Sequence, residues 1–315
     1  MAVKTVAGGA LVGLIQDSAV RSASIADRVC KTVALLARRG YALGPERVAQ
    51  VCIGGAISPR EVRWAVAAAG RDLAIADDLV VDREGLARVD QIRSRAQGHG
   101  DDAGAYVEMT VRFVRSLVVL APFIRSVSIA GSLASGGFRA SDDVDLNLIV
   151  DDGHRHLAYV AVNALGLVHA LAHRAKPVDD LTRRPIAPRL MTANLILERS
   201  QYLPLQRQDE DMAFELLMAE PLFGVESIQE LMGANPALVE HFPQLANKPA
   251  ALLIEPTPTH RFPSALFPRF LDGAARTLGE RAWRYMQWTR RHHPDALERV
   301  RYVRSTMRPY ALFDR

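Results

Sequence analysis

The first part of the chain alternates between short amphipathic segments and turn-forming residues. Apolar side chains recur at helical spacing in two segments that end at Gly40 and Gly54. A third helix is predicted to begin after Ser58, because a proline follows the serine and Glu61 completes a capping box with it. Residues 72–85 then alternate as two short strands around a turn, so the pattern predicts three helices and a hairpin.

The centre of the chain combines helix and strand patterns. The polar stretch 93–104 is predicted to be a linker, and the apolar helix that follows it is predicted to end at Pro122. Three strand-like runs come next, over residues 124–131, 143–151 and 189–198. A helix over 154–173 lies between the last two runs, and from about residue 209 onward the pattern is helical.

Two aspartates interrupt the second of the strand-like runs. Side chains at alternate positions of a strand share a face, so Asp143, Asp145 and Asn147 are expected on one face, opposite Val144 and Leu146. Two adjacent carboxylates repel each other and are costly to desolvate. A divalent cation with oxygen ligands neutralises both, and Mg²⁺ in turn prefers a phosphate-bearing substrate as a further ligand. The pattern therefore predicts a Mg²⁺ and phosphate site.

A Gly-Ser pair stands at the end of the first strand-like run. Gly131 allows close approach of the backbone, while backbone amides and the Ser132 hydroxyl can donate hydrogen bonds to a phosphate. Ser135 and the two glycines after it either close over the phosphates or form a mobile turn. Arg139 is the cation nearest to the expected phosphates.

Gly-Ser, a ten-residue gap and then Asp-Val-Asp-Leu resembles the nucleotidyltransferase superfamily of DNA polymerase β. The match covers about residues 104–200, and FELLMAEPLFG and GANPALVEHFP are similar to segments of an uncharacterised bacterial branch. The resemblance implies an α+β fold with a small mixed sheet and flanking helices. It implies transfer of a nucleoside monophosphate from an NTP, with release of pyrophosphate and two Mg²⁺ ions. Asp143 and Asp145 would bind metal, and Gly131 and Ser132 would hold the β- and γ-phosphates.

The superfamily usually supplies a third carboxylate from a neighbouring strand. In RLMTANLILERS the corresponding residue is Asn194, which offers a carbonyl oxygen but no charge. Glu198, expected on the same strand face, and Asp179 and Asp180 in the preceding loop are alternative sources of the missing acid. Three interpretations stay open: an enzyme with a substituted ligand, a slow enzyme that uses one metal, and an inactive nucleotide-binding relative.

Together these patterns predict three domains and two classes of function. The domains are a winged-helix-like unit over 1–97, a nucleotidyltransferase core over 104–200 and a helical domain over 201–315. The first function is a Mg²⁺-dependent nucleotidyltransferase whose acceptor is a small molecule, a protein or an RNA with a hydroxyl or phosphate group. The alternative is an inactive nucleotide-binding regulator whose winged-helix-like unit binds DNA or a protein.

Charge and composition narrow the expected partners. The formal net charge of +4 permits an anionic substrate or a nucleic acid. The predicted hairpin is acidic, however, which disfavours DNA binding there and favours a docking or dimerisation role. The two cysteines are predicted to be reduced core thiols. No run of about 18 apolar residues occurs, so we expect no membrane-spanning helix. The N-terminus lacks a sustained apolar region before a clear cleavage site, so we expect a cytoplasmic protein, with a degenerate signal peptide as the alternative.

Overall fold

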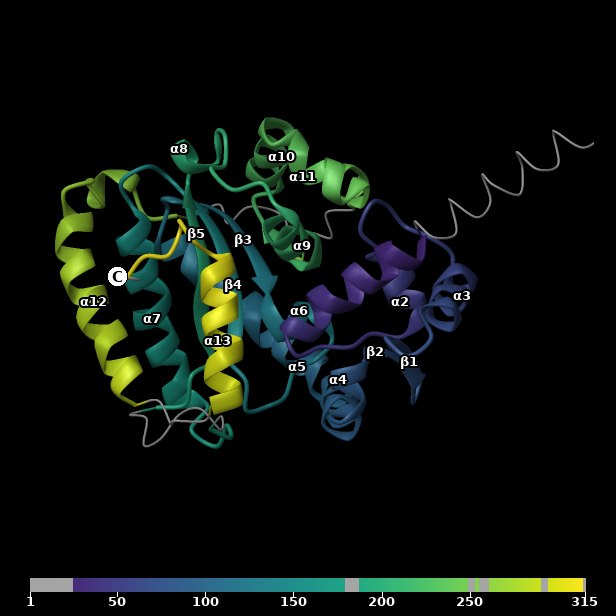
Figure 1. The fold of residues 1–315 in the computed structure, drawn as a ribbon. Coiled ribbons are helices and arrows are strands. Elements are labelled where there is room, and N and C mark those ends of the chain that lie inside the picture. Colours follow the sequence, from purple (N-terminus) through teal and green to yellow (C-terminus); the bar gives the residue numbers. More distant parts are fainter. Residues whose placement is uncertain (1–24, 179–186, 249–252, 255–260, 290–293, 314–315) are drawn as a thin grey trace, which may run out of the picture. The chain divides into compact units, whose positions relative to one another are not determined.

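The computed structural model describes residues 25–178, 187–248, 253–254, 261–289 and 294–313 (Figure 1). The chain divides into two compact units, Met1–Asp90 and Gln91–Arg315. The architecture is α+β, as the sequence predicts, with a two-stranded hairpin in the first unit and a mixed four-stranded sheet in the second.

In the described part of the first unit, three helices precede the hairpin and a short helix follows it. These elements are a helix over 25–38, α2 (Pro45–Gln50), α3 (Pro59–Ala69), β1 (Leu73–Ala76), β2 (Leu79–Asp82) and α4 (Arg83–Leu86). The Ser58 hydroxyl accepts a hydrogen bond from Glu61 N at 3.2 Å, and Glu61 Oε2 accepts one from Ser58 N at 2.6 Å. The predicted capping box is therefore confirmed.

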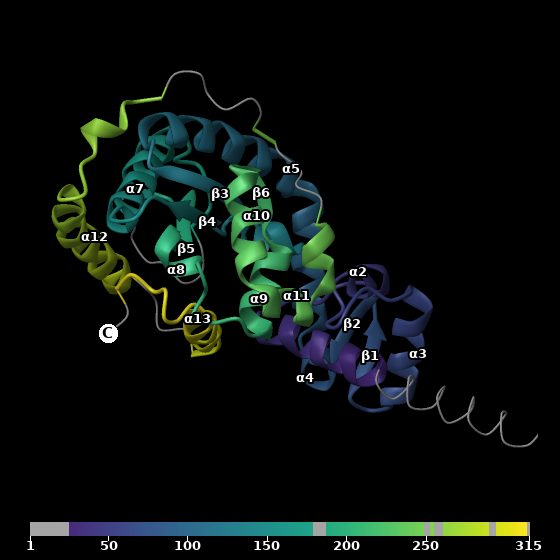
Figure 2. The same cartoon turned by 90° about the horizontal axis from the view of Figure 1, so that it is seen from above.

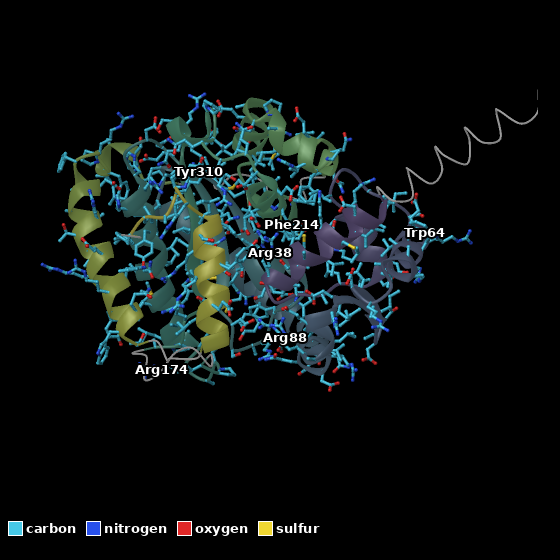
Figure 3. All side chains as sticks on the ribbon, viewed as in Figure 1. Arg38, Trp64, Arg88, Arg174, Phe214 and Tyr310 are labelled. Carbon is cyan, nitrogen blue, oxygen red and sulfur yellow. The ribbon has the colours of Figure 1, made fainter. Side chains whose placement is uncertain are left out.

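Local backbone geometry closes the hairpin. Asp77 and Asp78 have φ angles of 50° and 64°, the left-handed conformation that a two-residue hairpin turn requires. Figure 3 labels Trp64 on α3, an exposed aromatic residue of the first unit. The hairpin pattern in the sequence is thus confirmed as two antiparallel strands.

Helix α5 (Val89–Leu120) includes the stretch 93–104, so the prediction of a linker there is wrong. Each glycine inside a helix costs about 1 kcal/mol relative to alanine, and tertiary contacts offset that cost here. Arg95 Nε donates to the Gly137 carbonyl at 3.0 Å, and Arg95 Nη2 pairs with Asp142 Oδ2 at 2.8 Å. These partners lie more than forty positions away, where periodicity in a short window gives no information.

The mixed sheet forms the centre of the second unit. Its strands are β3 (Ile124–Ala130), β4 (Val144–Val150), β5 (Met191–Glu198) and β6 (Glu220–Phe223), in the order β5-β4-β3-β6. Strand β4 runs parallel to β5 and antiparallel to β3, and β3 runs antiparallel to β6. The three predicted strands are confirmed. The helical pattern predicted from about residue 209 onward misses β6, an edge strand, which is the position that tolerates its proline.

Helices cover the two faces of the sheet differently. Helices α5 and α7 (Arg155–Ala172) pack against the face that carries Val144, Leu146 and Leu148, and these side chains are buried. The remaining elements are α6 (Gly131–Ser135), α8 (Arg199–Tyr202), α9 (Glu210–Met218), α10 (Val225–Ala234), α11 (Pro236–His241), η1 (Pro243–Asn247), η2 (Ser264–Leu266), α12 (Leu271–Trp288) and α13 (Pro294–Thr306). Helices α9, α10 and α11 lie together (Figure 2), and side chains from all three line a pocket over the opposite face.

Helix α12 lies beside α7 and caps its first turn (Figure 1). Asp272 Oδ1 accepts hydrogen bonds from the backbone N–H groups of His156 and Leu157 at 2.8 and 2.9 Å. The other oxygen, Oδ2, lies 2.7 Å from His156 Nδ1. A carboxylate from α12 thus satisfies amide groups that the first turn of a helix leaves without partners.

Candidate functional site

The polar face of β4 carries the two predicted metal-binding carboxylates. Asp145 and Asn147 lie on this face, and Asp143 immediately precedes the strand. The alternate residues Val144 and Leu146 are fully buried on the opposite face. The strand alternation predicted from the sequence is confirmed by this placement.

Gly131 brings the Gly-Ser turn against the second of these carboxylates. Its neighbour Ala130 pairs with Asp145 across β3 and β4, and Gly131 has a φ angle of 60°. A Cβ atom at Gly131 would overlap Oδ2 of Asp145 and would lie 2.9 Å from its carboxyl carbon. Only glycine therefore fits at this position, for both conformational and steric reasons.

The two predicted serines lie in helix α6, directly after Gly131. Ser132 is buried in the first turn, and the helix has no side-chain cap at its N-terminus among the described residues. The Ser135 hydroxyl donates a hydrogen bond to the Gly131 carbonyl at 2.8 Å. Ser135 therefore braces the glycine turn, while Ser132 lies next to it.

The loop between α6 and β4 is fixed by hydrogen bonds. Asp142 Oδ2 accepts from the backbone N–H of Arg139 at 3.2 Å and from Arg95 at 2.8 Å. Tyr106 donates to the carbonyl of residue 140 at 2.9 Å, and Lys176 donates to that of residue 141 at 2.9 Å. Burial raises the pKa of Asp142, Arg95 opposes that rise, and Asp143 adds to it. The loop holds the backbone of Arg139 against the carboxylate of Asp142.

Strand β5 and the segment just before it provide two partners for Asp143. The Thr192 hydroxyl donates a hydrogen bond to Asp143 Oδ2, and Arg189 Nη1 lies 3.8 Å from the same oxygen. Thr192 is also the residue of β5 that pairs in register with Asp145. Asp143 is thus oriented by a hydroxyl from β5 and by a cation from the residues that precede β5.

A carboxylate that the sequence analysis did not single out, Glu215 on α9, faces the same group. Its Oε1 atom accepts hydrogen bonds from Asn147 Nδ2 at 3.1 Å and from Asn194 Nδ2 at 2.9 Å. Asn194 Nδ2 also lies 2.9 Å from Asn147 Oδ1, so the three side chains form a closed network. The signal in the sequence was an acid, Glu215, at the start of the apolar run of FELLMAEPLFG.

Burial and the nearby carboxylates change the pKa of Asp145. Burial raises the pKa of Asp145 well above its usual range, and the neighbouring carboxylates Asp143, Glu215 and Asp142 raise it further. The guanidinium of Arg189 opposes this rise. A carboxylate that is difficult to ionise among other carboxylates is one that a bound cation would stabilise.

Glu198 does not join this group. It pairs with Val150 at the other end of β4, about 16 Å from Asp145 at about 3.3 Å per residue. The register of β5 also shifts by one residue at Asn194, which places Glu198 on the sheet face opposite to the carboxylates. Its Oε1 accepts a hydrogen bond from Gly153 N at 2.7 Å, a role in stabilising a turn. The expectation of a shared face with Asn194 is corrected by this shift.

The residues of the candidate site suit a Mg²⁺ ion held by two protein carboxylates. Asp179 and Asp180 lie outside the described residues. Within the described ranges, no three His, Cys, Asp or Glu side chains are grouped as a metal site. Mg²⁺ typically takes one or two carboxylates and completes its shell with substrate phosphates and water. Asp143 and Asp145 fit that requirement.

Comparison of the chain with known protein families, with curated proteins and with solved structures finds no match. In the described part of the chain, no helix has the length and apolar character needed to cross a bilayer.

Proposed function

We propose that this protein is a Mg²⁺-dependent nucleotidyltransferase that transfers a nucleoside monophosphate from an NTP to an acceptor and releases pyrophosphate. The observation that carries the proposal is the close approach of Gly131 to Asp145, which joins a phosphate-binding turn to a metal-binding carboxylate. The perturbed pKa of Asp145 supports it, because such shifts are concentrated at functional sites.

The proposal includes a finer assignment of the fold. Elements α5, β3, α6, β4, α7 and β5 form the nucleotidyltransferase core in chain order. The helices and hairpin before residue 90 form a winged-helix-like unit. A small mixed sheet with flanking helices is what the resemblance of Gly-Ser and Asp-Val-Asp-Leu implies.

Each residue of the site has a role in binding. The backbone amides at Gly131 and Ser132, with the Ser132 hydroxyl, bind the outer phosphates of the NTP, and Arg139 contributes positive charge. Asp143 and Asp145 hold the metal, which supplies positive charge to the phosphate oxygens when it is bound. Thr192 and Arg189 keep Asp143 in position.

Glu215 takes the role of the acid that Asn194 does not supply. In the described part of the chain its hydrogen bonds use Oε1, which leaves Oε2 to accept the proton of an acceptor hydroxyl. Asn147 and Asn194 orient the carboxylate by donating to Oε1. The acceptor oxygen bonds to the α-phosphorus as the bond to the β-phosphate oxygen breaks, and pyrophosphate leaves.

The test is incubation of the full chain with Mg²⁺, cell extract and each of the four NTPs labelled at the α-phosphate. We expect label on one class of acceptor, with release of pyrophosphate, and loss of both in Asp145→Asn. The matched control is Asp151→Asn, which alters a partly exposed ion pair with Arg125 just beyond the other end of β4. Transfer by Asp145→Asn at the wild-type rate would overturn the proposal. NTP binding without pyrophosphate release would favour the inactive regulator.

A further inference from the structure

A pocket of about 410 Å³ lies on the sheet face that carries the carboxylates. Strand residues that include Ser128, Asn147 and Leu195 line one side of it. Side chains of α10, α11 and η1, such as Ile228 and Leu245, line the other side. Its volume is in the range of sites that hold small molecules.

The described lining is aliphatic and uncharged except for one lysine. It contains no aromatic ring, carboxylate or guanidinium among the described residues, and its neutral polar groups are Ser126, Ser128, Asn147 and Gln229. The ammonium of Lys248 donates to backbone carbonyls at the end of α9, at 3.2 and 2.7 Å for Leu216 and Leu217. Nucleobases are usually bound by stacking on aromatic side chains, and anions need a cation. The lining therefore suits a neutral aliphatic molecule.

One end of the pocket adjoins the proposed proton acceptor. Asn147 lines the pocket and donates its hydrogen bond to Glu215 at 3.1 Å. It follows Asp145 by two positions on the same strand face, a separation of about 7 Å. Leu216, the residue after Glu215, lines the pocket as well. A molecule that fills the pocket thus has one end at Asn147, the side chain that donates to Glu215.

We propose that this pocket binds the acceptor and that the acceptor is an aliphatic alcohol. The inference rests on the proposed function. The hydrocarbon chain lies among Leu195, Ile228 and Leu245, and the hydroxyl lies at Asn147. That hydroxyl gives its proton to Glu215, its oxygen bonds to the α-phosphorus of the NTP, and pyrophosphate leaves with the electrons of the broken P–O bond. The product is an alkyl ester of a nucleoside monophosphate.

Two glycines offer a matched pair of variants. Gly233 on α10 lines the pocket, and Gly273 on α12 does not. Both are exposed, and a Cβ at either would meet no atom within 4 Å. Gly233→Leu adds an aliphatic side chain at the pocket, whereas Gly273→Leu adds the same side chain elsewhere. Ile228→Trp is a second pocket variant in case the first rearranges locally.

The experiment uses the full chain with 1-octanol as the probe and glycerol as the polar control. We expect 1-octanol, and not glycerol, to raise the melting temperature of the wild type without metal or NTP. Gly233→Leu and Ile228→Trp should weaken octanol binding by about tenfold or more, equal to about 1.4 kcal/mol. Binding of Mg²⁺ and NTP, measured by calorimetry, should be unchanged in these variants. Gly273→Leu should match the wild type in both measurements.

Separate readouts distinguish failure of the pocket from failure of the proposed function. If the wild type does not bind octanol, or if the pocket variants bind it as the wild type does, the inference is overturned whether or not NTP is bound. If octanol binds as expected but no labelled NTP yields an octyl ester, the acceptor role is overturned. Absence of Mg²⁺-NTP binding in the same preparation would overturn the proposed function itself.

Discussion

Glu215 on α9 brings a carboxylate to the position near which β5 supplies only the neutral Asn194. Glu215→Gln keeps an oxygen for the amides of Asn147 and Asn194 but removes the carboxylate proposed to act as the base, so transfer should fall by a factor of about 100 or more. Mg²⁺-NTP affinity should change little. Glu198→Gln, on the opposite sheet face, should transfer at nearly the wild-type rate. Initial rates at saturating NTP test this, and the reverse order of the two variants would exclude Glu215 as the base.

The raised pKa of Asp145 predicts how the stability of the metal-free protein depends on pH. An unfolded aspartate has a pKa of about 3.9, so between that value and the higher folded pKa the folded state binds more protons. Stability from this group is therefore greatest at low pH and falls as pH rises through that interval. Asp145→Asn should raise the melting temperature at pH 7 in EDTA and flatten this decline. If the melting temperature of Asp145→Asn depends on pH as that of the wild type does, the raised pKa of Asp145 is contradicted.

The residues that sequence analysis placed correctly are those that depend on local geometry. Asp143, Asp145 and Gly131 follow from strand alternation and from a turn next to a strand. Glu215 could not be placed, because it reaches Asn147 across 68 positions of the chain. Glu198 was placed on the wrong face because one extra residue in β5 reverses the alternation, and nothing in RLMTANLILERS marks that residue.

At the scale of elements, long periodic segments were predicted well and short or irregular ones were not. The strands β3, β4 and β5 and the helix α7 have clear patterns in sequence. Strand β6 has four residues, too few for a pattern, and it forms by pairing with β3. The N-terminal half of α5 lacks an apolar stripe and depends on distant partners of residues such as Arg95.

The packing of α12 against the first turn of α7 should depend on Asp272, and so should the stability of the protein. Loss of a capping carboxylate costs about 1 kcal/mol, so Asp272→Ala should lower the free energy of unfolding at pH 7 by roughly this amount. Glu280→Ala, on the same helix and paired with the exposed Arg284, should change it by about 0.5 kcal/mol or less. Urea unfolding of both variants provides the measurement.

The contribution of Asp272 to the free energy of unfolding depends on pH with the opposite sign to that of Asp145. Burial alone would raise the pKa of Asp272, but hydrogen bonds from His156 and from Leu157 N outweigh burial, so the pKa is lower than usual. The stabilisation is present above the unfolded pKa of about 3.9 and is lost as pH falls through the folded value. The difference between wild type and Asp272→Ala should therefore shrink towards pH 3. A constant difference would show that the cap acts without its charge.

At the scale of the whole molecule, every described residue of the candidate site belongs to the second unit. A fragment of residues 91–315 should therefore bind Mg²⁺-NTP with about the affinity of the full chain, and residues 1–90 should not bind it. Calorimetry on both fragments tests this, with circular dichroism to verify folding. Loss of binding in a folded 91–315 fragment would show that the first unit contributes to the site.

The register shift in β5 adds a residue, Asn194, that the sheet does not pair but that belongs to the candidate site. Ala193 pairs with Leu146 and Leu195 pairs with Asn147, so Asn194, which lies between them, has no paired residue on β4. A chain lacking this one residue would pair β5 with β4 without interruption, yet it would lose one of the two amides that donate to Glu215. Under the proposed function, one inserted residue can therefore add a polar contact to the site while the residues on either side of it in β5 stay paired with β4.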